Sequence, residues 1–232
     1  MFKISIRDNF LRVKENIESA LIASGRNKDD IILVGVTKTV DVDSINEAIS
    51  YGLENIGENK VQEIMDKYDK IKGNVNWHMI GHLQTNKVKY IIDKVDLIHS
   101  LDRMSLAKEI NKRAESENII KDVLIQVNIA EEETKFGLKK EEVIPFIESI
   151  LDFKNIRIKG LMTIAPFSEN PEEVRFVFRD LRNLGYEIEK RNYENLEMKY
   201  FSMGMTNDYK VAIEEGANIV RIGTAIFGKR VY

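Results

Sequence analysis

Eight short apolar runs recur along the chain, and the amphipathic segments between them most constrain the fold. The runs, each long enough for one buried strand, are Ile31–Val36, Leu53–Ile56, Val75–Ile80, Val95–His99, Val123–Ile129, Ile156–Ile164, Met198–Ser202 and Ile219–Ile222. Strands that alternate with helices form parallel sheets with right-handed crossovers. The pattern therefore predicts an α/β fold, a single (β/α)8 TIM barrel, with a doubly wound open sheet as the alternative.

The segments between the runs have helical periodicity, and one further helix precedes the first run. Apolar residues recur at Ile6, Phe10, Val13, Ile17 and Leu21, and Gly25 follows as a stop signal. Helices are also expected over the segments Asp41–Tyr51, Asn59–Ile71, Arg103–Glu117 and Pro171–Leu184, with none after the last strand. The chain has three prolines and no Gly/Ser-rich stretch. Residues 1–232 are therefore expected to form one domain with an extra N-terminal helix.

Charge and composition narrow the functional classes. The formal net charge is −3, which gives no general basic field for nucleic acid, and the chain has no cysteine for disulfides, thiol catalysis or zinc ligation. No apolar run approaches 18 residues, so no membrane partner is expected. The three histidines lack metal-ligand spacing, and no metal site is expected. A cytoplasmic protein is expected from this composition.

Polar residues follow the apolar runs, where the active site of a barrel lies. The last two loops hold Ser202, Gly204 and Thr206, then Gly223 and Thr224. Phosphate sites in barrels are commonly built from these two loops with a helix N-terminus, where small residues let backbone N–H groups approach an anion. Ordinary turn chemistry is the alternative for each loop alone. Their pairing favours a phosphate site.

Lys38 follows the first run with no turn signal before it, at the mouth of a predicted buried strand. A lysine there, facing a phosphate site, could reach a phosphorylated carbonyl compound, since desolvation lowers its pKa and makes the amine nucleophilic. Two chemistries remain open at this point: an aldolase-like Schiff base with a sugar phosphate, and an internal aldimine with pyridoxal phosphate. Alternatively, the side chain extends from the strand end into solvent.

Five segments of the chain carry a resemblance to a known family: Val36–Val40, Ile56–Glu63, Trp77–Lys87, Gly160–Phe167 and Phe201–Gly228. Together they resemble the YggS/PROSC family of pyridoxal phosphate homeostasis proteins, which are similar in fold to the N-terminal barrel of alanine racemase. The segments are long and stand in the family's order, so the resemblance covers nearly the whole chain. It implies pyridoxal 5'-phosphate as the cofactor, held as an internal aldimine on Lys38.

The resemblance also implies roles for further residues. Arg221 falls where the barrel enzymes place an arginine against the pyridine nitrogen, and Asn59 where the family lines the ring or its phenolic oxygen. His78 is expected in the pocket wall. The cofactor phosphate is expected at Ser202, Gly204, Met205, Gly223 and Thr224, several of them through backbone N–H groups.

An arginine beside the pyridine nitrogen bears on catalysis. A guanidinium cannot accept a proton and disfavours a pyridinium next to it, so the ring is a weak electron sink. The resemblance therefore implies a protein of intracellular pyridoxal phosphate homeostasis that buffers or delivers the cofactor to apo-enzymes without substantial turnover. A weak pyridoxal phosphate-dependent amino-acid racemase and a cofactor-free aldolase-type barrel are the alternatives. A monomer is expected.

Overall fold

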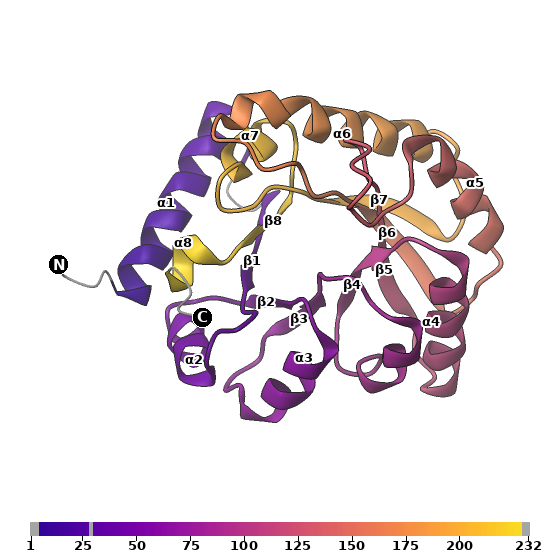
Figure 1. The fold of residues 1–232 in the computed structure, drawn as a ribbon, viewed down its shortest axis with the longest axis horizontal. Helices are drawn as coiled ribbons and strands as arrows, with labels where there is room; N and C mark the ends of the chain where they lie inside the picture. The colour runs from indigo at the N-terminus through magenta and orange to yellow at the C-terminus, as the bar shows by residue number, and fades with distance from the viewer. Residues whose placement is uncertain (1–4, 28–29, 229–232) are drawn as a thin grey trace.

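The computed structural model describes residues 5–27 and 30–228, and its centre is a closed barrel of parallel strands (Figure 1). Each strand pairs with the next in chain order, and β8 pairs with β1 to close the sheet. The strands are β1 Ile32–Val36, β2 Asn55–Glu58, β3 Asn76–Met79, β4 Leu97–Leu101, β5 Lys121–Gln126, β6 Ile156–Met162, β7 Leu196–Ser202 and β8 Ile219–Ile222. The predicted TIM barrel is confirmed, and the open sheet is excluded.

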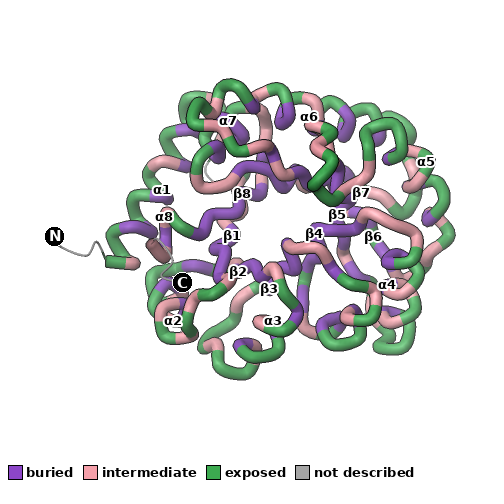
Figure 2. The backbone as a smooth tube through the Cα atoms, in the orientation of Figure 1, coloured by how far each residue is buried: buried purple, intermediate pink, exposed green. Residues whose placement is uncertain are grey.

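Helices surround the barrel, and Figure 2 shows buried backbone at the strands inside an exposed outer ring. The α-helices are α1 Ile6–Ala23, α2 Val42–Ser50, α3 Val61–Lys67, α4 Met104–Ser116, α5 Lys140–Ile150, α6 Arg175–Glu189, α7 Tyr209–Glu214 and α8 Thr224–Phe227. Short 3-10 helices are η2 Tyr68–Lys70, η3 Thr85–Tyr90 and η4 Pro171–Val174. The extra N-terminal helix is confirmed as α1, which begins after Ser5, whose hydroxyl accepts from the Asp8 N–H.

Two details differ from the sequence prediction. A helix does follow the last strand, because α8 starts directly after Gly223, and with four residues it is too short to show an amphipathic period. The segment from Pro171 begins as the 3-10 helix η4 and continues as α6 to Glu189. Asn170 caps this segment, since its Oδ1 accepts from the Glu172 N–H at 3.2 Å.

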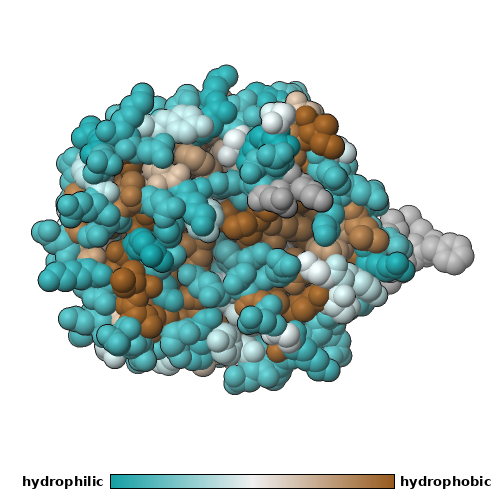
Figure 3. All heavy atoms as spheres, turned by 180° about the vertical axis from the view of Figure 1, so that it is seen from behind, coloured by the Kyte–Doolittle hydropathy of each residue, from teal (hydrophilic) through white to brown (hydrophobic). Residues whose placement is uncertain are grey.

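The apolar core has two parts on the two sides of the sheet. The larger part fills the layer between strands and helices. The smaller part fills the interior of the barrel and consists of Val34, Leu97, Leu124, Met162 and Ile219, from five different strands. Figure 3 shows the reverse face, where apolar surface lies among hydrophilic side chains. Over residues 5–27 and 30–228, no helix is both long enough and apolar enough to cross a membrane.

Candidate functional site

A cavity of about 390 Å³ lies among the loops that follow β1, β5, β6, β7 and β8. Five of the residues expected at the site line it: Lys38, Met205, Arg221, Gly223 and Thr224. Apolar residues of the loop after β6, such as Ile164 and Phe167, form another part of its lining. The five expected residues therefore meet at one end of the barrel, from the loops after β1 and β7 and from the end of β8.

Four other expected residues do not line this cavity, and their contact with a ligand stays a prediction. Ser202 is fully buried at the end of β7 and accepts a hydrogen bond from Arg221. His78 is buried in β3 and contacts His99 and Asn55. Asn59 is half-buried just after β2. Gly204 lies in the turn between β7 and α7.

Arg221 lines the cavity and is positioned by two hydrogen bonds. The residue is only 4% exposed, and its guanidinium donates to Ser202 Oγ at 2.6 Å and to the Thr163 carbonyl at 2.8 Å. Burial lowers the pKa of Arg221 to about 10, while the nearby charge of Asp208 acts in the opposite direction. The group therefore keeps its positive charge at neutral pH, and both hydrogen-bond partners are neutral oxygens.

A chain of hydrogen bonds runs from Arg221 across the interior of the barrel. Ser202 Oγ lies 2.9 Å from His99 Nδ1, His99 Nε2 lies 2.9 Å from His78 Nδ1, and His78 Nε2 lies 3.2 Å from Asn55 Oδ1. These side chains come from β8, β7, β4, β3 and β2 in turn. Local sequence patterns could not reveal this series of hydrogen bonds, because partners such as His99 and Ser202 are 103 residues apart in the sequence.

Both histidines of this hydrogen-bond chain are neutral. Burial lowers the pKa of His78 to about 4, and burial with the neighbouring His78 and Arg221 lowers the pKa of His99 well below its ordinary value. Asn55 Oδ1 can only accept, so we assign the proton of His78 to Nε2 and, by the same logic, that of His99 to Nε2. Ser202 then donates to His99 and accepts from Arg221, and every contact has one donor and one acceptor.

Tight backbone packing explains the two glycines expected near a phosphate. Gly204 has a φ of 92°, and an added Cβ would come within 2.6 Å of the Ala212 Cβ and 2.9 Å of the Tyr209 Cα. At Gly223 an added Cβ would lie 3.2 Å from the Val36 carbonyl oxygen. At Gly204 only glycine avoids strain, whereas at Gly223 the neighbouring backbone would have to shift by a few tenths of an ångström.

The loop before α7 differs in one respect from the expected phosphate cradle. The Met205 N–H donates to Asp208 Oδ1 at 2.6 Å, and burial raises the pKa of Asp208. Helix α7 begins at Tyr209, after a turn. The Met205 amide is therefore bonded within its own loop, and an anion contact through this amide stays a prediction.

Sequence reasoning missed several residues of the cavity. Lys135, from the loop after β5, lines it as a second lysine, and Phe167 does so with 77% of its surface exposed. Asp208 also lines it, and its carboxylate accepts from the Met205 N–H. Each of these residues follows a predicted strand, and this position was the signal in the sequence that could have identified them. In the described part of the chain, no group of three or more His, Cys, Asp or Glu side chains could hold a metal ion.

Comparison with known proteins gives consistent matches over nearly the whole chain. The family model for the alanine racemase N-terminal domain matches residues 12–231. A pyridoxal phosphate homeostasis protein of Aquifex aeolicus is 51% identical over 222 residues, which cover 95% of this chain and 96% of the relative. This relative is therefore similar along its full length.

Two solved structures share the fold. A protein of unknown function from Bifidobacterium adolescentis superposes with a TM-score of 0.90 at 34% identity, covering 95% of this chain and 94% of that one. PipY of Synechococcus elongatus, solved with PLP bound, superposes with a TM-score of 0.80 at 27% identity, covering 91% of this chain and 100% of that one.

Proposed function

The chain belongs to the family of the alanine racemase N-terminal domain and, within it, to the pyridoxal phosphate homeostasis proteins; on this premise we propose that it binds pyridoxal 5'-phosphate in the cavity at the mouth of its barrel. The structure of PipY with PLP bound supports the proposal, as does the name of the Aquifex aeolicus relative. The single observation that carries it is the convergence of Lys38, Arg221 and Gly223 on one cavity of about 390 Å³.

The residues present fit this cofactor in charge and shape. Arg221 supplies a buried positive charge whose bonded partners are neutral, which suits an anionic or lone-pair-bearing ligand atom. Gly223 and Thr224 bring the backbone at the start of α8 to the cavity wall, beside Met205 and Thr206. Apolar groups such as Val36 and Ile164 offer a wall for an aromatic ring.

Lys38 is the residue we assign to the covalent bond. Its neutral amine would attack the aldehyde carbon of the cofactor, and a Schiff base would form as one water leaves with the aldehyde oxygen and both amine protons. Arg221 would face the pyridine nitrogen. A guanidinium donates a hydrogen bond there and gives up no proton, so the ring stays a weak electron sink.

The proposed role is therefore to buffer the cofactor and to deliver it, not to turn over amino acids. A cytoplasmic location, a monomeric state and delivery to apo-enzymes are parts of this proposal that rest on the sequence alone. Racemase activity would require removal of an α-proton. Incubation with L- and D-alanine in deuterated water measures it directly, and exchange at enzyme-like rates would contradict the carrier role.

The binding site itself is tested by trapping. The protein is incubated with pyridoxal 5'-phosphate, its visible absorption is recorded, and borohydride reduction is followed by peptide mapping. We expect a yellow absorption band and a reduced adduct on Lys38, and we expect Lys38→Met to lose both. Lys135→Met is the matched control, since Lys135 lines the same cavity, and it should keep the adduct on Lys38. An adduct on any other lysine alone, or none, would contradict the proposal.

A further inference from the structure

The backbone turn that carries Lys38 is strained. The Val40 N–H donates to the Thr37 carbonyl at 2.9 Å, which closes a four-residue turn with Lys38 and Thr39 at its centre. Thr39 has a φ of 62°. A positive φ at this third position is typical of a type II turn, where glycine or asparagine is favoured, and a β-branched residue in this conformation is an outlier. The turn therefore depends on other contacts to persist.

Helix α3 supplies contacts on both sides of Lys38. Lys67 Nζ donates to the Thr37 carbonyl at 2.8 Å, and Glu63 Oε2 accepts from the Thr39 N–H at 2.6 Å. Lys67 and Glu63 also form an i,i+4 ion pair at 2.9 Å. The peptide group before Lys38 and the peptide group after it are thus each bonded to a charged side chain of the same helix.

Glu58, at the end of β2, bonds both to Lys67 and to the turn that carries Lys38. Its side chain is fully buried, and Oε1 accepts from Lys67 Nζ and from the Thr37 hydroxyl, each at 2.7 Å. The ammonium of Lys67 therefore donates to three oxygens, those of Glu58, Glu63 and Thr37, and uses all of its N–H bonds. These contacts fix the side chain of Lys67 at the strained turn.

We propose that Glu63 and Lys67 are positioning residues that hold this strained turn in the conformation presenting Lys38 to the cavity. This inference rests on the proposed function, because it assigns to α3 the control of how fast and how tightly Lys38 captures the aldehyde. The segment from Ile56 to Glu63, which the family resemblance singled out, then has a physical role. It carries two of the carboxylates that support the lysine turn.

The first test replaces Glu63 with alanine. Glu63 is partly exposed on a short helix, so Glu63→Ala should fold, while the charge-assisted bond to the Thr39 N–H is lost. We expect affinity for pyridoxal 5'-phosphate to fall about tenfold and borohydride trapping on Lys38 to slow by a similar factor. Glu109→Ala is the matched control: Glu109 forms an i,i+4 pair with Arg113 at 2.7 Å on α4 and should leave both values unchanged.

The second test is rescue at the strained residue. Glycine adopts a positive φ without strain, so Thr39→Gly should make the turn independent of its support. We expect Thr39→Gly to restore most of the affinity that Glu63→Ala loses. If Glu63→Ala weakens binding by the same factor in the natural sequence and in the Thr39→Gly background, or leaves binding unchanged, then Glu63 does not act through the turn and the inference is wrong.

The third test needs no cofactor and separates the two proposals. Amide hydrogen exchange at Thr39 in the full-length protein should be at least about tenfold faster in Glu63→Ala, because its hydrogen bond is removed. Unchanged exchange would overturn the inference even if the protein binds pyridoxal 5'-phosphate. Faster exchange in a protein that forms no adduct on Lys38 would instead support the turn's dependence on Glu63 and contradict the proposed function.

Discussion

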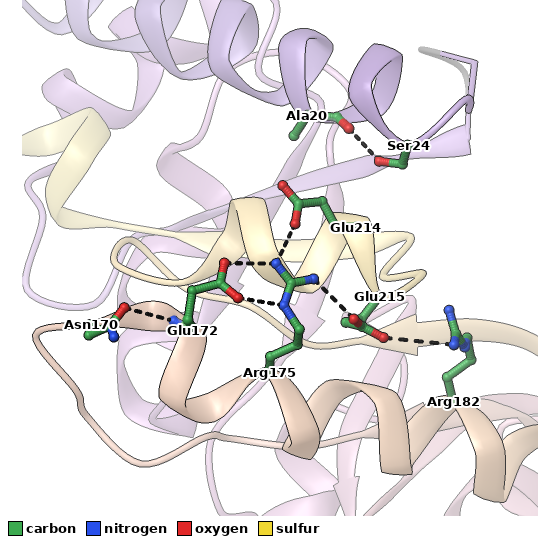
Figure 4. Close-up of polar contacts among 8 residues, drawn as sticks. All are labelled: Ala20, Ser24, Asn170, Glu172, Arg175, Arg182, Glu214 and Glu215. Carbon is green, nitrogen blue, oxygen red and sulfur yellow. Dashed lines mark hydrogen bonds and ion pairs between the residues drawn. The ribbon is translucent and has the colours of Figure 1, made fainter.

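Two arginines of this protein have opposite surroundings. Arg221 is buried in β8 and donates to two neutral oxygens, the Ser202 hydroxyl and the Thr163 carbonyl. Arg175, at the start of α6, donates to three carboxylates (Figure 4). These belong to Glu172 at 2.7 Å, Glu214 at 2.5 Å and Glu215 at 3.0 Å. The charge of Arg175 is therefore neutralised by carboxylates, whereas Arg221 is bonded only to neutral groups.

The pKa values of the two groups shift in opposite directions for this reason. Burial lowers the pKa of Arg221 to about 10, whereas hydrogen bonds to Glu172 and Glu214 raise the pKa of Arg175. Arg175 ties the start of α6 to the end of α7, which is a structural role. A buried charge without an ionic bond destabilises the fold, and its retention at a cavity indicates a role in binding.

A fall in pH should distinguish the region around Arg221 from the region around Arg175 more strongly than any substitution. The hydrogen-bond chain behind Arg221 contains His78, whose folded-state pKa is about 4 against 6.5 for an ordinary histidine. The unfolded state binds more protons between these values, so stability is lost as the pH falls from 6.5 towards 4. From His78 alone we expect a loss of about 3 kcal/mol in the free energy of unfolding, measured by urea denaturation across this range.

His78→Gln should remove this part of the pH dependence while keeping hydrogen-bonding capacity at the position. Glu172 responds only at lower pH, because the hydrogen bond from Arg175 lowers the pKa of this carboxyl below its ordinary value of 4.5. The same pH dependence in His78→Gln and in the natural sequence would show that His78 does not titrate as a buried neutral group.

Substitution of each arginine by methionine should affect a different property. Arg221→Met should weaken binding of pyridoxal 5'-phosphate by at least about tenfold, because a cation facing the ligand is lost. Stability should change little, since removal of an unpaired buried charge offsets the loss of a donor to Ser202 and to the Thr163 carbonyl. Titration of the absorption band and thermal unfolding measure the two effects. Unchanged affinity would show that Arg221 does not contact the cofactor.

Arg175→Met should give the smallest effect and the opposite pattern. The guanidinium of Arg175 is partly exposed, and solvent screening limits each of its ion pairs. We expect a loss of about 1 kcal/mol in the free energy of unfolding, reduced in 1 M salt, with unchanged cofactor affinity. A larger loss of affinity than in Arg221→Met would reverse the comparison and assign Arg175 a role in shaping the cavity.

Local sequence signals predicted most of the fold. The first apolar run predicts a strand over Ile31–Val36, and the observed β1 spans Ile32–Val36. The agreement is close because a buried parallel strand has a continuous apolar sequence. Strand β7 starts earlier than expected, at Leu196, since its first residues alternate and only the later ones form an apolar run. Lys38 and Gly223 could be identified from their places after predicted strands, whereas Arg221 was expected at the site only from the family resemblance.

The interior of the barrel could not be predicted in the same way. Closure pairs Val34 of β1 with Arg221 of β8, and no short-range pattern encodes a register between strands so far apart. His78 and His99 looked like isolated histidines, and only the meeting of β3 and β4 inside the barrel makes them partners.

The sequence by itself determined which segments become strands and helices and which ends of the strands carry polar side chains. Both follow from short-range apolar periodicity. Only the tertiary structure decided that Lys67 and Glu63 bind the peptides beside Lys38, and that a line of neutral side chains crosses the barrel to Arg221. The physical reason is that these hydrogen bonds depend on ångström-scale distances between elements, which arise only when the sheet closes.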